Sequence, residues 1–166
     1  DRYVVYNYLE QAWSYGNLSR TYWLDRGTKN YPRAVSNNYL YEHEFGYNDD
    51  GSPMTGVFIE SSDFDIGDGE QFAFINRIVP DVRFLNNSAA GKVNMVLKTR
   101  NFPGQSLSTS STNQVGSDTT QVFTRARARQ GVLRLESDDD ASGTGNNDTG
   151  WRLGATRLDV RTDGRR

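Results

Sequence analysis

The segment "QFAFINRIVPDVRF", residues 71–84, decides the fold class of this chain. Its apolar residues recur mainly at every second position, so that in an extended chain they share one face. A period of two is typical of a strand that is buried on one side, and it predicts β-structure here. The face expected to be apolar carries Phe72, Phe74, Ile78, Val82 and Phe84, and the opposite face carries Arg77, Asp81 and Arg83.

The same alternation recurs along the chain, and no segment favours a helix. In "TTQVFTRARAR" (119–129) Phe123 and three arginines alternate with small or apolar residues. "VVYNYLEQAWSYG" (4–16) combines β-branched and aromatic residues with a glycine, which favours a hairpin turning at Glu10 and Gln11. We therefore predict an all-β fold. Further strands are expected in 39–47, 92–98, 131–136, 150–153 and 156–161.

The composition divides the chain into two regions. Residues 1–54 are crowded with Tyr and Trp, and a strand, a turn and an Ala-Trp-Ser sequence follow one another as in a propeller blade. We expect the end of a β-propeller there, one blade or part of one. Residues 55–166 predict a β-sandwich-like antiparallel domain. Two polar segments, 104–120 and 137–150, are expected to be long loops because they lack apolar periodicity.

Charge and cysteine content exclude several classes of function. The net charge of −2 gives no global attraction to nucleic acid or to a membrane. The absence of cysteine excludes disulfides and cysteine-ligated zinc, and no run is long enough to span a bilayer. The sequence starts at Asp1, within an expected strand, so we expect a fragment of a longer protein.

"ESSDFDIGDGEQF" (60–72) is dense in acids and glycines and invites a calcium-site interpretation. Counted from Asp63, however, the EF-hand pattern fails at the fifth, sixth and twelfth positions. A hairpin turning at 67–69 accounts better for the glycines and the apolar flanks. A surface calcium ion bound by Asp63, Asp65 and Asp68 remains the weaker option, and otherwise we expect neither metal nor cofactor.

Three arginines, Arg125, Arg127 and Arg129, are expected on one face of a strand. They would face DNA, or they would form a solvated or inter-subunit face paired with "ESDDD" (136–140), which is the less demanding interpretation. No stacking aromatics are interleaved in this short motif. His43, the one histidine, is expected to be packed among aromatics. No nucleophile–histidine–acid arrangement is present in the sequence pattern, so we expect no enzyme activity.

Four segments stand out: "YVVYNYLEQAWSYGNLSRTYWLDRG" (3–27), "NYLYEHEFGYND" (38–49), "IESSDFDIGDGEQFAFINRIVPDVRF" (59–84) and "GWRLGATRLDVRTDGRR" (150–166). Together they resemble the C-terminal part of tail or neck structural proteins of short-tailed bacteriophages. The resemblance is to the tail-nozzle (tail tubular protein B) type or the packaged-DNA-stabilisation type. It implies a virion protein whose copies form a homo-oligomeric ring with other tail or neck proteins. Such a ring passes genomic DNA without sequence specificity, and no catalytic residue carries over.

Two alternatives belong to other functional classes. In a carbohydrate-binding β module, exposed Tyr and Trp rings would stack on sugars and the acidic segment would bind calcium. In a glycosidase fragment, which is the less favoured alternative, Asp63, Asp68 or Glu70 would act as the paired carboxylates. Acids within one turn rarely face each other across a substrate.

Overall fold

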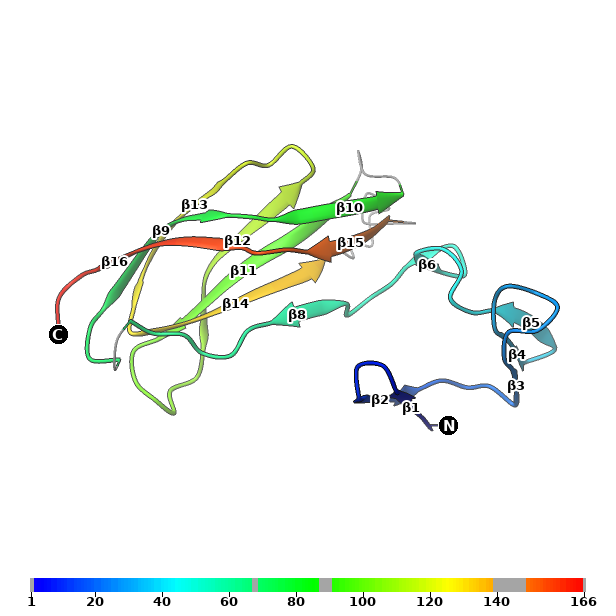
Figure 1. Cartoon of the computed structure of the whole chain (residues 1–166). Helices are drawn as coiled ribbons and strands as arrows, with labels where there is room; N and C mark the ends of the chain where they lie inside the picture. The colour runs from blue at the N-terminus through cyan, green and yellow to red at the C-terminus, as the bar shows by residue number, and fades with distance from the viewer. Residues whose placement is uncertain (1, 67–68, 87–90, 139–148, 166) are drawn as a thin grey trace. The chain divides into compact units, whose positions relative to one another are not determined.

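The structure is a computed structural model that describes residues 2–66, 69–86, 91–138 and 149–165. Within these residues the regular elements are all β-strands, paired antiparallel in several small sheets (Figure 1). The all-β prediction is therefore confirmed. The chain divides into two compact units, Asp1–Gly46 and Tyr47–Arg166, whereas the sequence suggested a boundary after residue 54.

The first unit begins with the predicted hairpin, formed by β1 (Arg2–Asn7) and β2 (Ala12–Asn17). The side chain of Asn7 organises the turn, because its Oδ1 accepts hydrogen bonds from the backbone N–H groups of Leu9 (3.1 Å) and Glu10 (3.2 Å). Gln11 closes the turn in a left-handed conformation, with φ of 53°. These contacts satisfy backbone donors locally, as turns with Asn commonly do.

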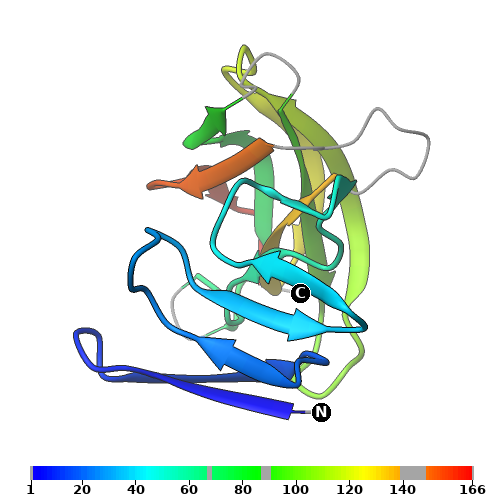
Figure 2. The same ribbon diagram turned by 90° about the vertical axis from the view of Figure 1, so that its right-hand side faces the viewer.

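Three strands make the second sheet of this unit, in the order β3 (Tyr22–Leu24), β4 (Arg33–Ser36) and β5 (Tyr39–Glu42) (Figure 2). Asn37 and Asn38 join β4 to β5 with φ of 49° and 68°, as a two-residue type I′ turn requires. The strand expected over 39–47 ends early at Glu42. Glu44 has φ of 59°, a left-handed conformation that interrupts the alternation.

The second unit contains a four-stranded sheet in the order β12-β11-β14-β8. Its strands are β8 (Phe58–Glu60), β11 (Lys92–Arg100), β12 (Ser108–Gly116) and β14 (Gln130–Ser137). β12 lies inside the segment 104–120, so the prediction of one continuous loop there was wrong. Its many Ser, Thr, Asn and Gln side chains give no apolar periodicity. The segment is nevertheless a strand, because it pairs with β11. Most of the segment 137–150 lies outside the described residues.

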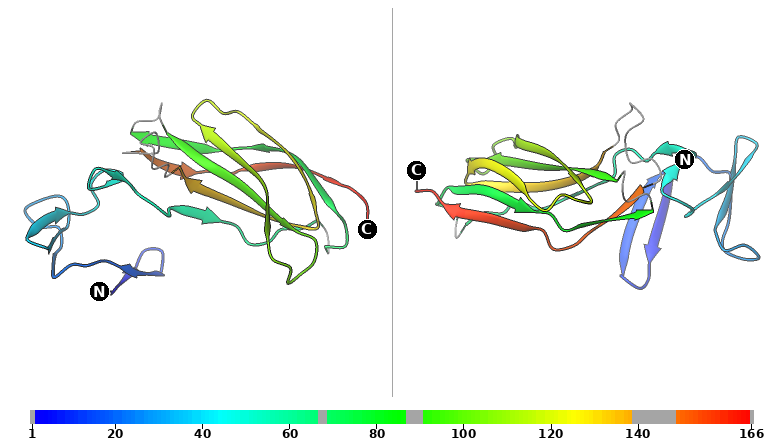
Figure 3. Two further views of the ribbon diagram at one scale, coloured as in Figure 1. Left: turned by 180° about the vertical axis from the view of Figure 1, so that it is seen from behind. Right: turned by 90° about the horizontal axis from the view of Figure 1, so that it is seen from above.

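The other main sheet of this unit has the order β13-β9-β16. It is built from β9 (Ala73–Val79), β13 (Val122–Ala128) and β16 (Arg157–Thr162). β10 (Val82–Asn86) comes directly after β9 in the chain, and β15 (Thr149–Leu153) comes directly before β16. β10 and β15 pair antiparallel with each other, as β9 and β16 do (Figure 3). A short hairpin of β6 (Asn48–Asp49) and β7 (Ser52–Pro53) precedes these sheets.

One apolar core joins both main sheets and β10. The four-stranded sheet contributes Val93, Met95, Leu97, Val115 and Leu135. The facing residues from the other elements are Ile75, Ile78, Phe84, Val122 and Ala126. Burial of these side chains is the main favourable term for folding of this unit.

The face of β9 that is buried differs in part from the prediction. Ala73, Ile75 and Ile78 are buried, whereas Phe74 is only half-buried and belongs to the other face. The cause is a break in register between Arg77 and Ile75 in the pairings with both β13 and β16. An irregularity of this kind shifts the alternation by one residue, so a strict period of two misassigns the first half of the strand.

The acidic segment 60–72 connects two different sheets and is not a hairpin of two paired strands. β8, before it, pairs with β14, whereas β9, after it, pairs with β13 and β16. Gly67 and Asp68 lie outside the described residues. Phe64 anchors the segment through two backbone hydrogen bonds to Gly131, of 2.8 and 2.9 Å. The predicted GDG hairpin was therefore wrong.

We predict that Gly131→Ala destabilises the protein by about 1–3 kcal/mol. A Cβ at this position would lie 2.6 Å from Cζ of Phe64, so the ring has to leave its place on β14. Urea or thermal unfolding measures the effect. Gly27→Ala is the matched control, because a Cβ there meets no atom within 4 Å. Equal stability of the two variants would contradict the packing of Phe64 on Gly131.

Candidate functional site

A surface rich in arginine covers the outward side of the β13-β9-β16 sheet. Burial alternates along β13, so that Phe123, Arg125 and Arg127 are exposed between buried neighbours. Cross-strand register forms one row of Phe123, Arg77 and Asp159, in that order across the sheet, and a second row of Arg127, Phe74 and Arg161. We call this surface the arginine face. Its members are Phe74, Arg77, Phe123, Arg125, Arg127, Arg157, Asp159 and Arg161.

The three arginines expected from the sequence have different surroundings. Arg125 is exposed. Arg127 forms an ion pair with Asp163 and lies 4.0 Å above the ring of Phe72, a favourable cation–π distance. Arg129 is half-buried just beyond the end of β13, 5.2 Å from the same ring, and its Nε is buried without a hydrogen-bond partner among the described residues. Aromatic rings are thus interleaved with the arginines, which the linear motif did not show.

The predicted partner segment 136–140 does not neutralise these arginines in its described part. Glu136 accepts a hydrogen bond from Nε of Arg134 at 2.7 Å, and Asp138 accepts one from Nε2 of Gln114 at 2.7 Å. Asp139 and Asp140 lie outside the described residues. The acid that reaches Arg127 is Asp163, which follows β16 in the sequence.

The outward side of the other main sheet has a balanced set of charges. Glu60 accepts hydrogen bonds from Lys98 (2.6 Å) and Arg134 (3.4 Å), and Arg100 pairs with Asp63. The hydrogen bond from Lys98, with the nearby positive charges, lowers the pKa of Glu60, and the bonds to Glu136 and Glu60 raise the pKa of Arg134. The two sheets therefore differ in charge on their outward sides.

Sequence reasoning missed most of the arginine face. Arg77, Arg157 and Arg161 come from strands far from β13 in the sequence, and only pairing through β9 brings them together. Arg83 and Arg152 extend the positive charge, because they oppose each other across β10 and β15 on the side away from Phe84 and Trp151. The sequence does contain a signal for this surface: the alternating segments 71–84, 150–153 and 156–161 each carry arginine at polar positions.

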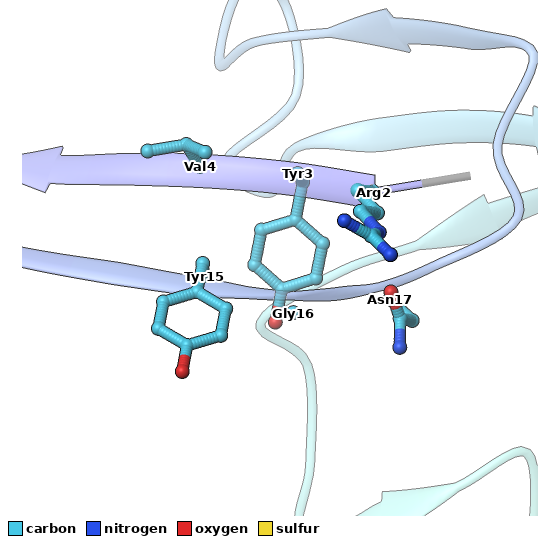
Figure 4. A pocket seen from close by; sticks show the side chains of 6 residues that line it. All are labelled: Arg2, Tyr3, Val4, Tyr15, Gly16 and Asn17. Carbon is cyan, nitrogen blue, oxygen red and sulfur yellow. The ribbon is translucent and has the colours of Figure 1, made fainter.

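A second candidate surface is the hairpin in the Asp1–Gly46 unit. Val4 lies opposite Tyr15, and Tyr6 lies opposite Trp13 with ring centroids 4.6 Å apart. Val4 and the three aromatic side chains form one apolar row, which we call the aromatic row and in which Trp13 is 71% and Tyr15 is 87% exposed. On the other side, the ring of Tyr3 covers Gly16, where a Cβ would lie 2.4 Å from the Tyr3 hydroxyl oxygen. Figure 4 shows a pocket at this end of the hairpin; its lining residues are Arg2, Tyr3, Val4, Tyr15, Gly16 and Asn17.

The three-stranded sheet of the same unit exposes another apolar row. Tyr22, Val35 and Leu40 stand next to one another across β3, β4 and β5, and all three are exposed. Among the described residues of the unit, the buried ones are Pro32, Ala34 and Ser36. The unit therefore presents most of its large apolar side chains to its surroundings.

His43 is packed against aromatic and basic neighbours. Its ring lies 4.8 Å from that of Trp23, and its Nε2 accepts a hydrogen bond from Nε of Arg20 at 3.0 Å. Burial, together with the positive charge of Arg20, lowers the pKa of His43. The imidazole is thus held neutral and is occupied by structural contacts.

The acidic segment does not show a metal or catalytic arrangement in its described part. Asp63 is paired with Arg100, and Asp65 lies beside Gly69. Among the residues that the structure describes, no three His, Cys, Asp or Glu side chains are grouped to hold a metal ion. Asp68 lies outside these residues, so the calcium option through Asp63, Asp65 and Asp68 stays a prediction, as does the glycosidase option with Glu70.

Comparisons with known proteins add no relative. No family model matches the sequence, and no curated protein matches it. In the part of the chain that the structure describes, no helix is long and apolar enough to cross a membrane.

We predict that His43 titrates below the ordinary pKa of a histidine. Because the unfolded state then binds the proton more readily, the Asp1–Gly46 unit loses stability as pH falls through the ordinary value towards the lower one of the folded state. An NMR titration reports this directly, since the chain has a single imidazole. Arg20→Gln is expected to raise the pKa by removing the nearby positive charge. An ordinary or elevated pKa in the unaltered chain would contradict the packing described for His43.

Proposed function

We propose that this chain is a non-enzymatic structural component of a short-tailed phage tail or neck, where its copies form a ring that conducts and retains DNA. One observation carries the proposal: the Asp1–Gly46 unit exposes its apolar side chains in ordered cross-strand rows. Exposed apolar patches on a folded unit mark surfaces that bind other proteins. The family resemblance of the sequence supplies the kind of assembly.

The finer architecture is also part of the proposal. We infer that Asp1–Gly46 belongs to a β-propeller, in which each blade covers its neighbour and would bury rows such as Val4–Tyr15 and Tyr22–Leu40. The Tyr47–Arg166 unit is inferred to be a β-sandwich-like domain, which is supported by a core shared between its two main sheets. Neither unit requires a cofactor for this role.

The absence of enzyme activity is proposed on the contacts of the candidate catalytic groups. Asp63 is engaged by Arg100, and Nε2 of His43 is engaged by Arg20. A general acid or base needs a free position towards a substrate, and these contacts take up Oδ2 of Asp63 and Nε2 of His43.

A carbohydrate-binding module is the second candidate, favoured by the aromatic row on the hairpin. Trp13 and Tyr15 present exposed rings on the same side of β2, as sugar-stacking platforms do. Binding to a glycan array that Trp13→Ala abolishes would support this candidate, and no binding to any glycan would remove it.

Native mass spectrometry and electron microscopy of the full-length protein test the structural role. We expect a closed ring of copies in solution or in the virion, because the exposed rows need a covering partner. A monodisperse monomer, together with virions that lack the protein in their tail or neck, would overturn the proposal.

Replacing two exposed rings tests the surface itself. We expect Trp13→Ser with Tyr15→Ser to weaken assembly at least about tenfold, since Trp and Tyr commonly dominate protein interfaces. The free energy of unfolding of the subunit should fall by no more than about 1 kcal/mol, because both rings are exposed and the Tyr6–Trp13 ring pair is the main contact that is lost. Leu9→Ser, which changes an exposed residue in the turn, is the control and should assemble normally. Unchanged assembly of the double variant would exclude this row as the contact.

A further inference from the structure

We propose that the arginine face binds the phosphodiester backbone of nucleic acid without regard to sequence. The proposal rests on the proposed function for the presence of DNA near the chain, and on geometry for the site. The site is the outward side of the β13-β9-β16 sheet, extended by Arg83 and Arg152.

Unneutralised positive charge is the first argument. Arg125, Arg157 and Arg161 are exposed and form no ion pair with the residues that the structure describes. Asp159 lies 3.7 Å from Arg77, and Asp163 pairs with Arg127, which leaves the other arginines in excess. Like charges gathered on one face repel one another, and a bound anion relieves that repulsion, whereas on the other main sheet Lys98, Arg100 and Arg134 each pair with an acid.

Spacing is the second argument. Arg125 and Arg127 are two residues apart on one strand, which corresponds to about 6.8 Å. Arg127 and Arg161 stand in one cross-strand row with Phe74 between them, about 10 Å apart at two strand spacings. A regular array of cations on a sheet fits an anion that repeats its charge at short, regular intervals, as a phosphodiester chain does.

The side-chain chemistry is the third argument. Every cation on the face is an arginine, whose planar guanidinium group matches phosphate geometry with two hydrogen bonds. Phe123, which is 66% exposed, lies between Arg77 and Arg125 and offers a ring on which an unpaired base can stack. Phe72 holds Arg127 from below, at 4.0 Å from the ring centroid, and limits its freedom before binding.

An acidic protein surface is the competing partner, and the acidic segment nearest to the arginines in sequence is poorly suited to that role. The described acids of segment 136–138 are already engaged by Arg134 and Gln114, and Asp138 is buried. This segment of a second copy would have to break these contacts to reach the arginine face. Poly-glutamate distinguishes an acidic protein ligand from a phosphodiester in the experiment below.

The experiment measures binding of the chain to fluorescein-labelled (dT)30 and to a 30-base-pair duplex between 50 and 200 mM NaCl. We expect dissociation constants of about 1–100 µM at low salt and a steep loss of affinity with salt. Arg125→Gln with Arg161→Gln should weaken binding at least about tenfold and lower the salt slope by about 1.4 for the single strand or about 1.8 for the duplex. Arg125→Lys with Arg161→Lys should keep most of the slope.

Arg26→Gln with Lys29→Gln is the matched control, because it removes the same net charge from exposed residues of the other unit. Phe123→Ala distinguishes a single strand from a duplex as the ligand. If this variant loses affinity for (dT)30 alone, by about fivefold or more, the ligand is a single strand whose bases stack on Phe123. If the unaltered chain binds both probes equally, the face contacts the backbone only. No binding at 50 mM NaCl, equal loss in the control, or equally effective competition by poly-glutamate of the same charge would overturn the proposal. A chain that assembles into rings but fails here would leave the structural role intact.

Discussion

The alternation of buried and exposed residues along β13 is the constraint on which the Tyr47–Arg166 unit depends. Successive Cβ atoms of a strand point to opposite sides, so burying Val122 and Ala126 in the core forces Arg125 and Arg127 outwards. Thr124 is the polar exception on the buried side, and its hydroxyl donates to the carbonyl oxygen of Ile75 at 2.8 Å. The buried polar group is therefore satisfied, and one packing requirement determines both the core and the charged surface.

In the Asp1–Gly46 unit, backbone hydrogen bonding is well developed and apolar burial is small. Its strands pair well and its turns are organised by Asn7, Asn37 and Asn38, but its sheets cover little apolar surface. Backbone pairing without burial gives only marginal stability. Burial of apolar surface is what normally offsets most of the conformational entropy lost on folding, and this unit buries little. A unit of this kind gains its stability from whatever covers its rows, which connects the local structure to an assembly role.

Local residue patterns predicted the class of fold and several elements. The hairpin of residues 4–16, the alternation of 122–128 and the outward position of Arg125 and Arg127 follow from period two and from turn-forming residues. Segments without apolar periodicity were predicted less well: β12 is rich in Ser and Thr, and pairing with β11, not burial along its whole length, makes it a strand. The acidic segment 60–72 was assigned to a hairpin because nothing local reveals that its flanking strands join different sheets.

The sequence by itself determined that the chain forms β-structure and that one strand carries a row of arginines, because both follow from the side-chain period of an extended chain. Only the tertiary structure decided that Arg77, Arg157 and Arg161 join this row, since strands far apart in sequence meet through hydrogen-bonded register. It also decided that the buried side of β9 changes at Arg77, because a break in register shifts which residues face the core. Both outcomes are non-local: they depend on which strands pair, and no single segment contains that information.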